Sequence, residues 1–124
     1  MIALGTDILK VGRIDEVLGR LGDRFAHRIL TEDERLEYHN SAQPSRLLAK
    51  RFAAKEAVSK ALGTGIGRGV SWQDIQIEHD ENGAPTVHLS GGASRVARER
   101  GASRVLLSLA DEIDYVVAFA ALSE

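Results

Sequence analysis

Two carboxylates and one lysine stand at positions where charged side chains could do phosphate chemistry. Asp7 lies near the end of the alternating stretch 2–8, IALGTDI, which predicts a short and largely buried strand. Glu56 and Lys60 stand four residues apart within 45–62, whose content of good helix formers predicts a long helix. Carboxylates from two elements suit Mg2+, which keeps several waters and takes further ligands from phosphates. The alternative is a solvated strand-end residue at Asp7 and an ordinary surface pair of Glu56 with Lys60.

A glycine-rich segment, GTGIGRG at 63–69, follows that helix directly. Glycines let backbone N–H groups approach phosphate oxygens closely. The segment is not a Walker A loop, because no Gly-Lys-Ser/Thr ends it, and it lacks the preceding strand of a dinucleotide-binding fingerprint. It therefore predicts either a phosphate-binding loop or a flexible connector.

A series of arginines falls at helical spacing near the N-terminus. Arg20, Arg24 and Arg28 are spaced by four, and Arg13 precedes Arg20 by seven, so one helical stripe can carry all four. Beside them fall three apolar residues, Val17, Leu21 and Phe25. Such a stripe can dock an acidic helix. The alternative is a solvated face, because nearby acids dilute its charge.

The rest of the composition excludes several kinds of site. The chain has no cysteine, so disulfides, thiolate zinc sites and cysteine nucleophiles are excluded. Its four histidines lack metal-ligand spacing such as HxxxH, and we interpret them as structural or surface residues. There is no Gly-x-Ser-x-Gly elbow for a serine nucleophile. A net charge of -2, with no clustering of aromatic and basic residues on one strand, argues against nucleic-acid binding.

Length and composition indicate one globular domain over 1–124. The chain has 124 residues, 44% of them hydrophobic and 27% charged, which permits a single core and argues against wholesale disorder. The longest apolar stretches, such as 116–122, are too short to span a bilayer, so we expect no membrane insertion. The opening MIALGTD lacks the basic leader and apolar run of a secretory signal. We therefore expect a cytoplasmic protein.

Capping and turn residues divide the first half of the chain into helices. Apolar residues at three- and four-residue spacing predict an amphipathic helix over 13–30, with an interruption near 22–23. Thr31 and Glu34 have the spacing of a capping box, which starts a second helix. Pro44 suits the start of the third helix.

Strands dominate the second half. Alternation and turn residues predict a hairpin over 75–89, a short helix over 91–100, and two strands over 105–109 and 115–122. The resulting order is βαααββαββ. We therefore predict an α+β fold with a mostly antiparallel sheet packed against the long helix.

Three motifs add up to a family resemblance: GTDI at 5–8, RI at 13–14 and RFAAKEAVSKALGTGIG at 51–67. Further stretches support it: FAHRILTEDE at 25–34, SWQDIQI at 71–77 and NGAP at 82–85. Together they closely resemble the holo-acyl-carrier-protein synthases, the short bacterial type of 4′-phosphopantetheinyl transferase. The resemblance spans the whole chain at matching length and order, and it implies the fold of these transferases.

The resemblance implies a Mg2+-dependent enzyme that transfers 4′-phosphopantetheine from coenzyme A to a serine of apo acyl carrier protein. The other product would be adenosine 3′,5′-bisphosphate, and the reaction would support fatty acid biosynthesis. The metal ligands would be Asp7 and Glu56, and manganese would suit the same residues. Catalysis would rest on Glu56 and Lys60, with Glu56 as the base, directly or through a water. Coenzyme A would be bound by Ser59, Lys60, Gly63, Thr64, Gly65 and Pro85.

The resemblance also implies partners. Members of the family's short type are homotrimers with active sites between subunits. The acidic recognition helix of the carrier protein would dock on Arg13, Val17, Arg20, Arg24, Phe25 and Arg28.

One departure from the family pattern lies before the last strand. Many members have Ser-Ile/Leu-Ser-His there, whereas this chain has Ser-Leu-Ala-Asp at 108–111. Any role of that histidine therefore does not transfer to Asp111. Two alternatives to the transferase are a catalytically inactive coenzyme A-binding module and a small interaction domain that docks acidic helices without a cofactor.

Overall fold

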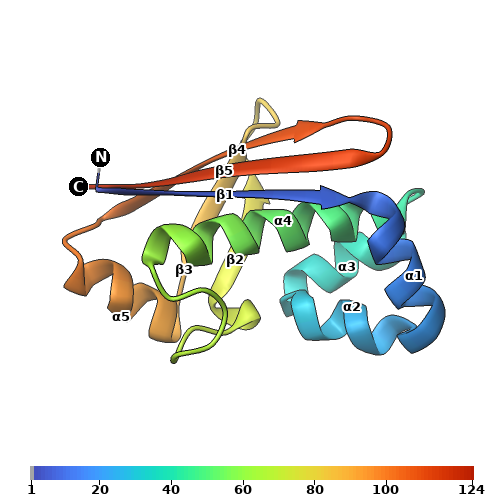
Figure 1. Cartoon of the computed structure of the whole chain (residues 1–124), viewed down its shortest axis with the longest axis horizontal. Coiled ribbons are helices and arrows are strands. Elements are labelled where there is room, and N and C mark those ends of the chain that lie inside the picture. The colour runs from blue at the N-terminus through green and yellow to red at the C-terminus, as the bar shows by residue number, and fades with distance from the viewer. Residues whose placement is uncertain (1) are drawn as a thin grey trace.

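The chain folds as one long helix covered on one side by a sheet, with shorter helices around it (Figure 1). The structure, a computed structural model, describes residues 2–124. Its elements are β1 (Ala3–Lys10), α1 (Val11–Leu21), α2 (Asp23–Ile29), α3 (Glu32–Asn40), α4 (Pro44–Leu62), the 3-10 turn η1 (Trp72–Asp74), β2 (Ile75–His79), β3 (Pro85–Leu89), α5 (Gly91–Glu99), β4 (Arg104–Asp111) and β5 (Tyr115–Ser123).

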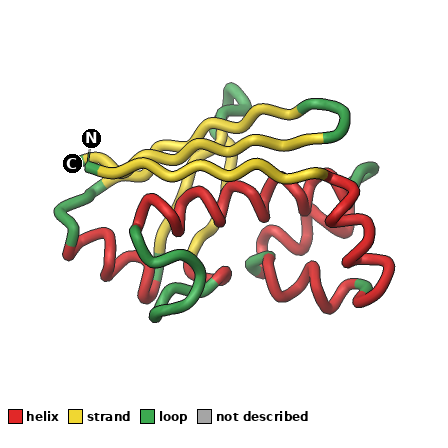
Figure 2. The backbone as a smooth tube through the Cα atoms, in the orientation of Figure 1, coloured by secondary structure: helices red, strands yellow, loops and turns green. Residues whose placement is uncertain are grey.

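Two antiparallel sheets make up the strand layer. One has three strands in the order β1-β5-β4, and the other is the β2-β3 hairpin. Figure 2 shows the three long strands lying over α4, which packs mainly against β1 and β5. The predicted α+β class and the mostly antiparallel sheet on a long helix are confirmed.

The helix predicted over 13–30 is wrong as a single element. Gly22 has a φ of 65° and ends α1, its N–H donating to the carbonyl of Leu18, and α2 starts at the next residue. Glycine adopts this left-handed φ without the steric cost of a side chain. The interruption expected near 22–23 is therefore a complete break, and one more helix precedes the hairpin than the predicted order contains.

Helix α4 forms the centre of the core because small residues line its sheet side. Ala53, Ala54, Ala57 and Ala61 are fully buried, and they let the strands approach closely. Pro44 occupies the first turn, where its missing N–H has no intrahelical partner to lose. Gly63 ends the helix in the left-handed conformation, with a φ of 84°. The predicted bounds of this helix are thus confirmed to within one residue.

The three-stranded sheet is apolar on both faces. On β5, Val116, Ala118, Ala120 and Leu122 are buried, whereas the alternate residues point away from the core. Five large apolar residues of this outward side are exposed, and we term them the outer sheet face: Leu4, Ile8, Leu106, Val117 and Phe119. Contiguous exposed apolar surface marks an interaction site in soluble proteins.

Among residues 2–124, no helix has the length and apolarity needed to cross a bilayer.

Candidate active site

A close backbone contact fixes Asp7 against α4. A Cβ placed on Gly5 would lie 2.0 Å from the carbonyl oxygen of Ala57 and 2.5 Å from the backbone N of Ala61, so only glycine fits there. Successive strand residues point to opposite faces, and Asp7 therefore shares the face of Gly5 that meets the helix. Glu56 and Lys60 precede Ala57 and Ala61 on α4. The contact thus holds one acid of β1 beside an acid and a base of α4.

Lys60 joins the two elements directly. Its ammonium donates to Asp7 Oδ1 at 3.2 Å and to the carbonyl oxygen of Thr6 at 3.0 Å. The Lys60 side chain is 49% exposed and that of Asp7 only 15%, so the carboxylate is sheltered while the ammonium reaches solvent. A phosphate can therefore approach Lys60 from outside.

Glu56 is half-buried, and its charge interacts with that of Asp7. Burial raises the pKa of Glu56 above its ordinary value, the negative charge of Asp7 raises it further, and Lys60 opposes both effects. Two carboxylates that repel each other are stabilised by a cation between them. We term Asp7 and Glu56 the acidic pair.

The acidic pair has the donors for a hard divalent cation and leaves most of its ligand positions open. Carboxylate oxygens suit Mg2+, which is held by one or two protein carboxylates, several waters and substrate phosphates. Among residues 2–124, no group of three or more His, Cys, Asp or Glu side chains could hold a metal ion. The chemistry of the donor set therefore fits a cation that is completed by a phosphate ligand.

The glycine-rich segment begins one turn beyond Lys60. The N–H groups of Thr64 and Gly65 both donate to the carbonyl of Ser59, at 3.3 and 3.0 Å, and Thr64 Oγ1 donates to the carbonyl of Gly65. Ser59 itself is buried, and its hydroxyl donates to the carbonyl of Glu56 at 2.8 Å. Ser59 thus shapes the end of the helix, and the turn that follows starts beside Lys60.

Two contacts that sequence reasoning missed anchor the glycine-rich segment at its ends. Arg100 donates to the carbonyl of Leu62 at 2.6 Å, and a Cβ on Gly63 would meet that guanidinium at 2.3 Å. At the other end, a Cβ on Gly92 would lie 1.7 Å from the carbonyl oxygen of Gly69. The Gly-Gly pair at 91–92 is a signal in the sequence for this close packing, although the sequence pattern there predicts only a short helix.

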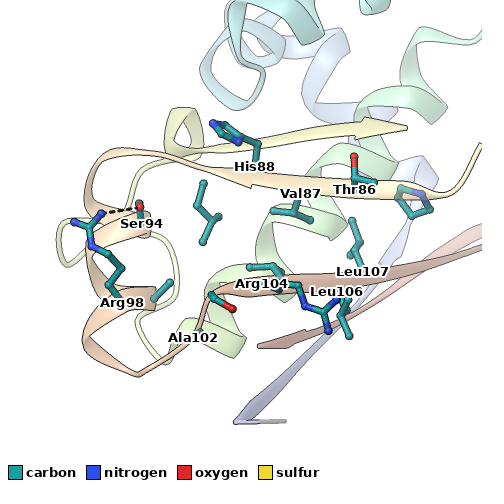
Figure 3. A pocket seen from close by; sticks show the side chains of 14 residues that line it. Thr86, Val87, His88, Ser94, Arg98, Ala102, Arg104, Leu106 and Leu107 are labelled. Atoms are coloured by element: carbon teal, nitrogen blue, oxygen red, sulfur yellow. Dashed lines mark hydrogen bonds between the residues drawn. The ribbon is translucent and has the colours of Figure 1, made fainter. Parts of the chain in front are cut away.

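Pro85 lies apart from the acidic pair within one chain. It opens β3 and lines a half-open cavity of about 750 Å3 between β3, α5 and β4 (Figure 3). The wall also contains Val87, Leu107 and Arg98, the last of which donates to Ser94 Oγ at 3.4 Å. None of the other residues predicted to bind coenzyme A or metal lines this cavity. Pro85 and the acidic pair therefore do not share this cavity within one chain.

The four arginines of the predicted stripe, Arg13, Arg20, Arg24 and Arg28, are all exposed. None of them forms a salt bridge to another part of the chain within residues 2–124. The break at Gly22 divides them between α1 and α2, so they do not lie on one continuous helix. Val17 and Phe25 are half-buried, and the Phe25 ring packs 6.3 Å from that of Phe52. We term the four arginines the basic face.

Asp111 holds the start of α4 to the β4–β5 turn. Its carboxylate accepts from Arg46 and lies 3.5 Å from Lys50 Nζ. Arg46 also donates to the carbonyl of Glu112 at 2.7 Å and to that of Ile113. The residue that departs from the family pattern is thus part of a surface ion-pair cluster.

Comparisons with known proteins show the family of this chain. Residues 3–120 match the 4′-phosphopantetheinyl transferase superfamily. The holo-[acyl-carrier-protein] synthase of Shewanella amazonensis is 56% identical over 122 residues, which cover 98% of each chain.

Solved structures give the same result. The crystal structure of holo-[acyl-carrier-protein] synthase from Neisseria meningitidis has a TM-score of 0.94 at 46% identity and covers 100% of both chains. The Helicobacter pylori enzyme, solved in complex with coenzyme A, has a TM-score of 0.84 at 29% identity and covers 97% of this chain and 99% of that one. The fold type implied by the sequence motifs is therefore confirmed. This chain belongs to the holo-[acyl-carrier-protein] synthases of the 4′-phosphopantetheinyl transferase superfamily.

Proposed function

We propose that this protein transfers the 4′-phosphopantetheine group of coenzyme A to a serine of apo acyl carrier protein, in support of fatty acid biosynthesis. The reaction depends on Mg2+ and releases adenosine 3′,5′-bisphosphate. The observation that carries the proposal is the meeting of Asp7, Glu56 and Lys60 at the start of the glycine-rich segment. A relative with the same fold was solved in complex with coenzyme A, which supports the same substrate here.

The chemistry requires neutralisation of charge on a pyrophosphate more than covalent catalysis. Asp7 and Glu56 would hold Mg2+, which supplies positive charge to the pyrophosphate when it is bound. Lys60 is exposed enough to leave Asp7 and contact a phosphate oxygen. The turn at Gly63, Thr64 and Gly65 lines the phosphate side, and Ser59 supports that turn through its backbone carbonyl.

The transfer step exchanges one phosphorus–oxygen bond for another. The serine oxygen of the carrier protein attacks the phosphorus attached to pantetheine, and the bond from that phosphorus to the bisphosphate oxygen breaks. Glu56, directly or through a water, accepts the serine proton. Glu56 is the half-buried carboxylate nearest this step on α4, four residues before Lys60. Lys60 stabilises the charge that develops on the leaving bisphosphate.

The carrier protein would dock on the basic face. Arg13, Arg20, Arg24 and Arg28 are free to pair with an acidic helix because they have no salt bridge within residues 2–124. Val17 and Phe25 supply apolar contact between them. Exposed charges of this kind raise the rate of encounter and set the orientation of a partner.

We also propose a homotrimer with active sites between subunits, acting in the cytoplasm as a single domain. The outer sheet face supports assembly, because Ile8 is 66% exposed and Leu106 50% exposed on an otherwise well-packed fold. Pro85 supports intersubunit sites, since the cavity that it lines contains neither carboxylate of the acidic pair of its own chain. A neighbouring subunit would supply Pro85 near the adenine of coenzyme A.

Intact-mass spectrometry of apo acyl carrier protein, incubated with this protein, coenzyme A and Mg2+, tests the proposal. The carrier should gain the mass of one phosphopantetheine group, and EDTA should prevent the gain. Binding of coenzyme A without any gain would instead identify an inactive coenzyme A-binding module. Binding of carrier protein with neither cofactor would identify a small interaction domain.

A further inference from the structure

Two histidines from different helices meet on the far side of α4 from the three-stranded sheet. His27 on α2 and His39 on α3 lie with their Nε2 atoms 2.8 Å apart, and their rings are nearly perpendicular, at 84°. Figure 1 shows α2 and α3 below α4 and away from β1. The two histidines are twelve positions apart in sequence, so a search for local metal-ligand spacing such as HxxxH does not find the pair.

Contacts behind the pair hold the backbone of His27 and the ring of His39. The carbonyl of His27 accepts from Arg35 Nη2 at 2.7 Å and from Gln73 Nε2 at 3.3 Å, which fixes the backbone of α2. The His39 ring packs edge-on against the buried ring of Tyr38, with centroids 5.1 Å apart. His27 is half-buried and His39 is exposed, so solvent reaches the pair. Two preplaced imidazoles with an open side have the form of a partial metal site.

We propose that His27 and His39 chelate a divalent transition-metal ion of the class that prefers imidazole, such as Zn2+. Two Zn–N bonds of about 2.0–2.1 Å at a tetrahedral angle place the nitrogens about 3.3 Å apart. The observed separation is 2.8 Å, so a small rotation of the exposed His39 ring makes room for the ion. Waters complete the coordination, because no third side-chain ligand joins the pair in the described part of the chain.

The proton balance of the pair permits binding without a change in its charge. In the hydrogen bond, one neutral imidazole carries its proton on Nε2 and the other accepts there. When the metal binds, that proton moves through solvent to Nδ1 of the same ring, so both Nε2 lone pairs face the ion. The site differs in chemistry from the acidic pair, whose oxygen donors suit Mg2+. It is independent of the proposed transfer reaction.

Calorimetric titration of Zn2+ into the full-length protein tests the site. Millimolar Mg2+ is present throughout, so that the hard cation occupies the acidic pair. We expect His27→Ala and His39→Ala each to weaken Zn2+ binding by at least about tenfold. His88→Ala is the matched control, because His88 is an exposed histidine on β3 without a ring partner among the described residues, and it should bind Zn2+ like the unaltered protein.

Thermal unfolding gives a second readout. An ion that bridges α2 and α3 binds only the folded chain, so a hundredfold excess of Zn2+ over its Kd should raise the Tm by roughly 5–10 °C. The rise should be absent in His39→Ala, which alters an exposed side chain and leaves the fold intact even if His27→Ala does not fold. No Zn2+ binding, or equal binding by all four proteins, would overturn the proposal.

Discussion

The ammonium of Lys55 lies 2.6 Å from Oε1 of Glu34, and both side chains are fully buried. The same carboxylate accepts from the N–H of Thr31 at 2.9 Å and of Ile77 at 2.7 Å, so it joins α3, α4 and β2. Lys55 also donates to the carbonyls of Ile29 and Trp72. Lys55 precedes Glu56 in the sequence, yet its side chain points away from the acidic pair towards α2, α3 and η1, where it holds these elements against α4.

Replacing Lys55 should therefore lower the stability of the fold, without removing a group that takes part in the transfer reaction. In Lys55→Met, the buried carboxylate of Glu34 loses its hydrogen-bonded countercharge and keeps only Arg51, whose Nε lies 4.0 Å from Oε2. The free energy of unfolding should therefore fall by about 3–5 kcal/mol. Lys50→Met removes a lysine whose partner Asp111 lies at the surface, and it should cost about 0–1 kcal/mol. Urea denaturation of both variants measures the difference, and equal losses would contradict the structural role of Lys55.

The contact of Gly5 with α4 predicts a loss of both stability and site geometry. Gly5→Ala places a methyl group against the backbone of Ala57 and Ala61, so we expect a loss of about 1–3 kcal/mol and a displaced Asp7. Gly19→Ala on α1 meets no atom within 4 Å, and it should stabilise the helix by about 0.5–1 kcal/mol. Chemical denaturation and the Mg2+ dependence of turnover measure the two effects. A Gly5→Ala protein as stable and active as its parent would refute this positioning.

The raised pKa of Glu56 predicts a stability that depends on pH. Because the folded-state pKa lies above the unfolded value, the folded state holds more protons between the two. The cost of ionising Glu56 is thus absent below the unfolded pKa and fully present above the folded pKa. Glu56→Gln should therefore stabilise the metal-free protein at pH 7.5, and the gain should shrink as pH falls toward 5. Thermal unfolding in EDTA measures this gain in stability at each pH. A gain that grows as pH falls toward 5 would contradict the raised pKa of Glu56.

The basic face predicts a selective defect in carrier recognition. Arg24→Glu should raise the KM for carrier protein several-fold with little change for coenzyme A, because Arg24 lies on the exposed side of α2. The defect should weaken at higher salt, since exposed charges are screened. Lys50→Glu reverses a charge on α4, outside the basic face and the residues proposed to bind coenzyme A, and serves as the control. Steady-state titration of each substrate checks this, and an unchanged carrier KM in Arg24→Glu would remove Arg24 from the docking surface.

Local signals in the sequence were sufficient for most of the fold. The capping box of Thr31 and Glu34, the proline at the start of α4 and the glycine at its end all predict the observed boundaries. Asp7, Glu56 and Lys60 were predicted to meet, and the structure places them together. Spacing did not reveal the meeting of His27 with His39, since packing of α2 on α3 brings them together. The assembly of subunits likewise depends on surfaces that no local pattern describes.

The transfer rate of acidic-pair variants tests the central claim most directly, that Asp7 and Glu56 hold the cation on which transfer depends. The measurement is the initial rate of carrier modification, followed by intact mass over a Mg2+ titration. Asp7→Asn and Glu56→Gln keep the shape of each side chain and remove its charge. We predict that each lowers the rate by at least about a hundredfold with an unchanged circular dichroism spectrum. A wild-type rate and Mg2+ dependence in either variant would contradict the claim.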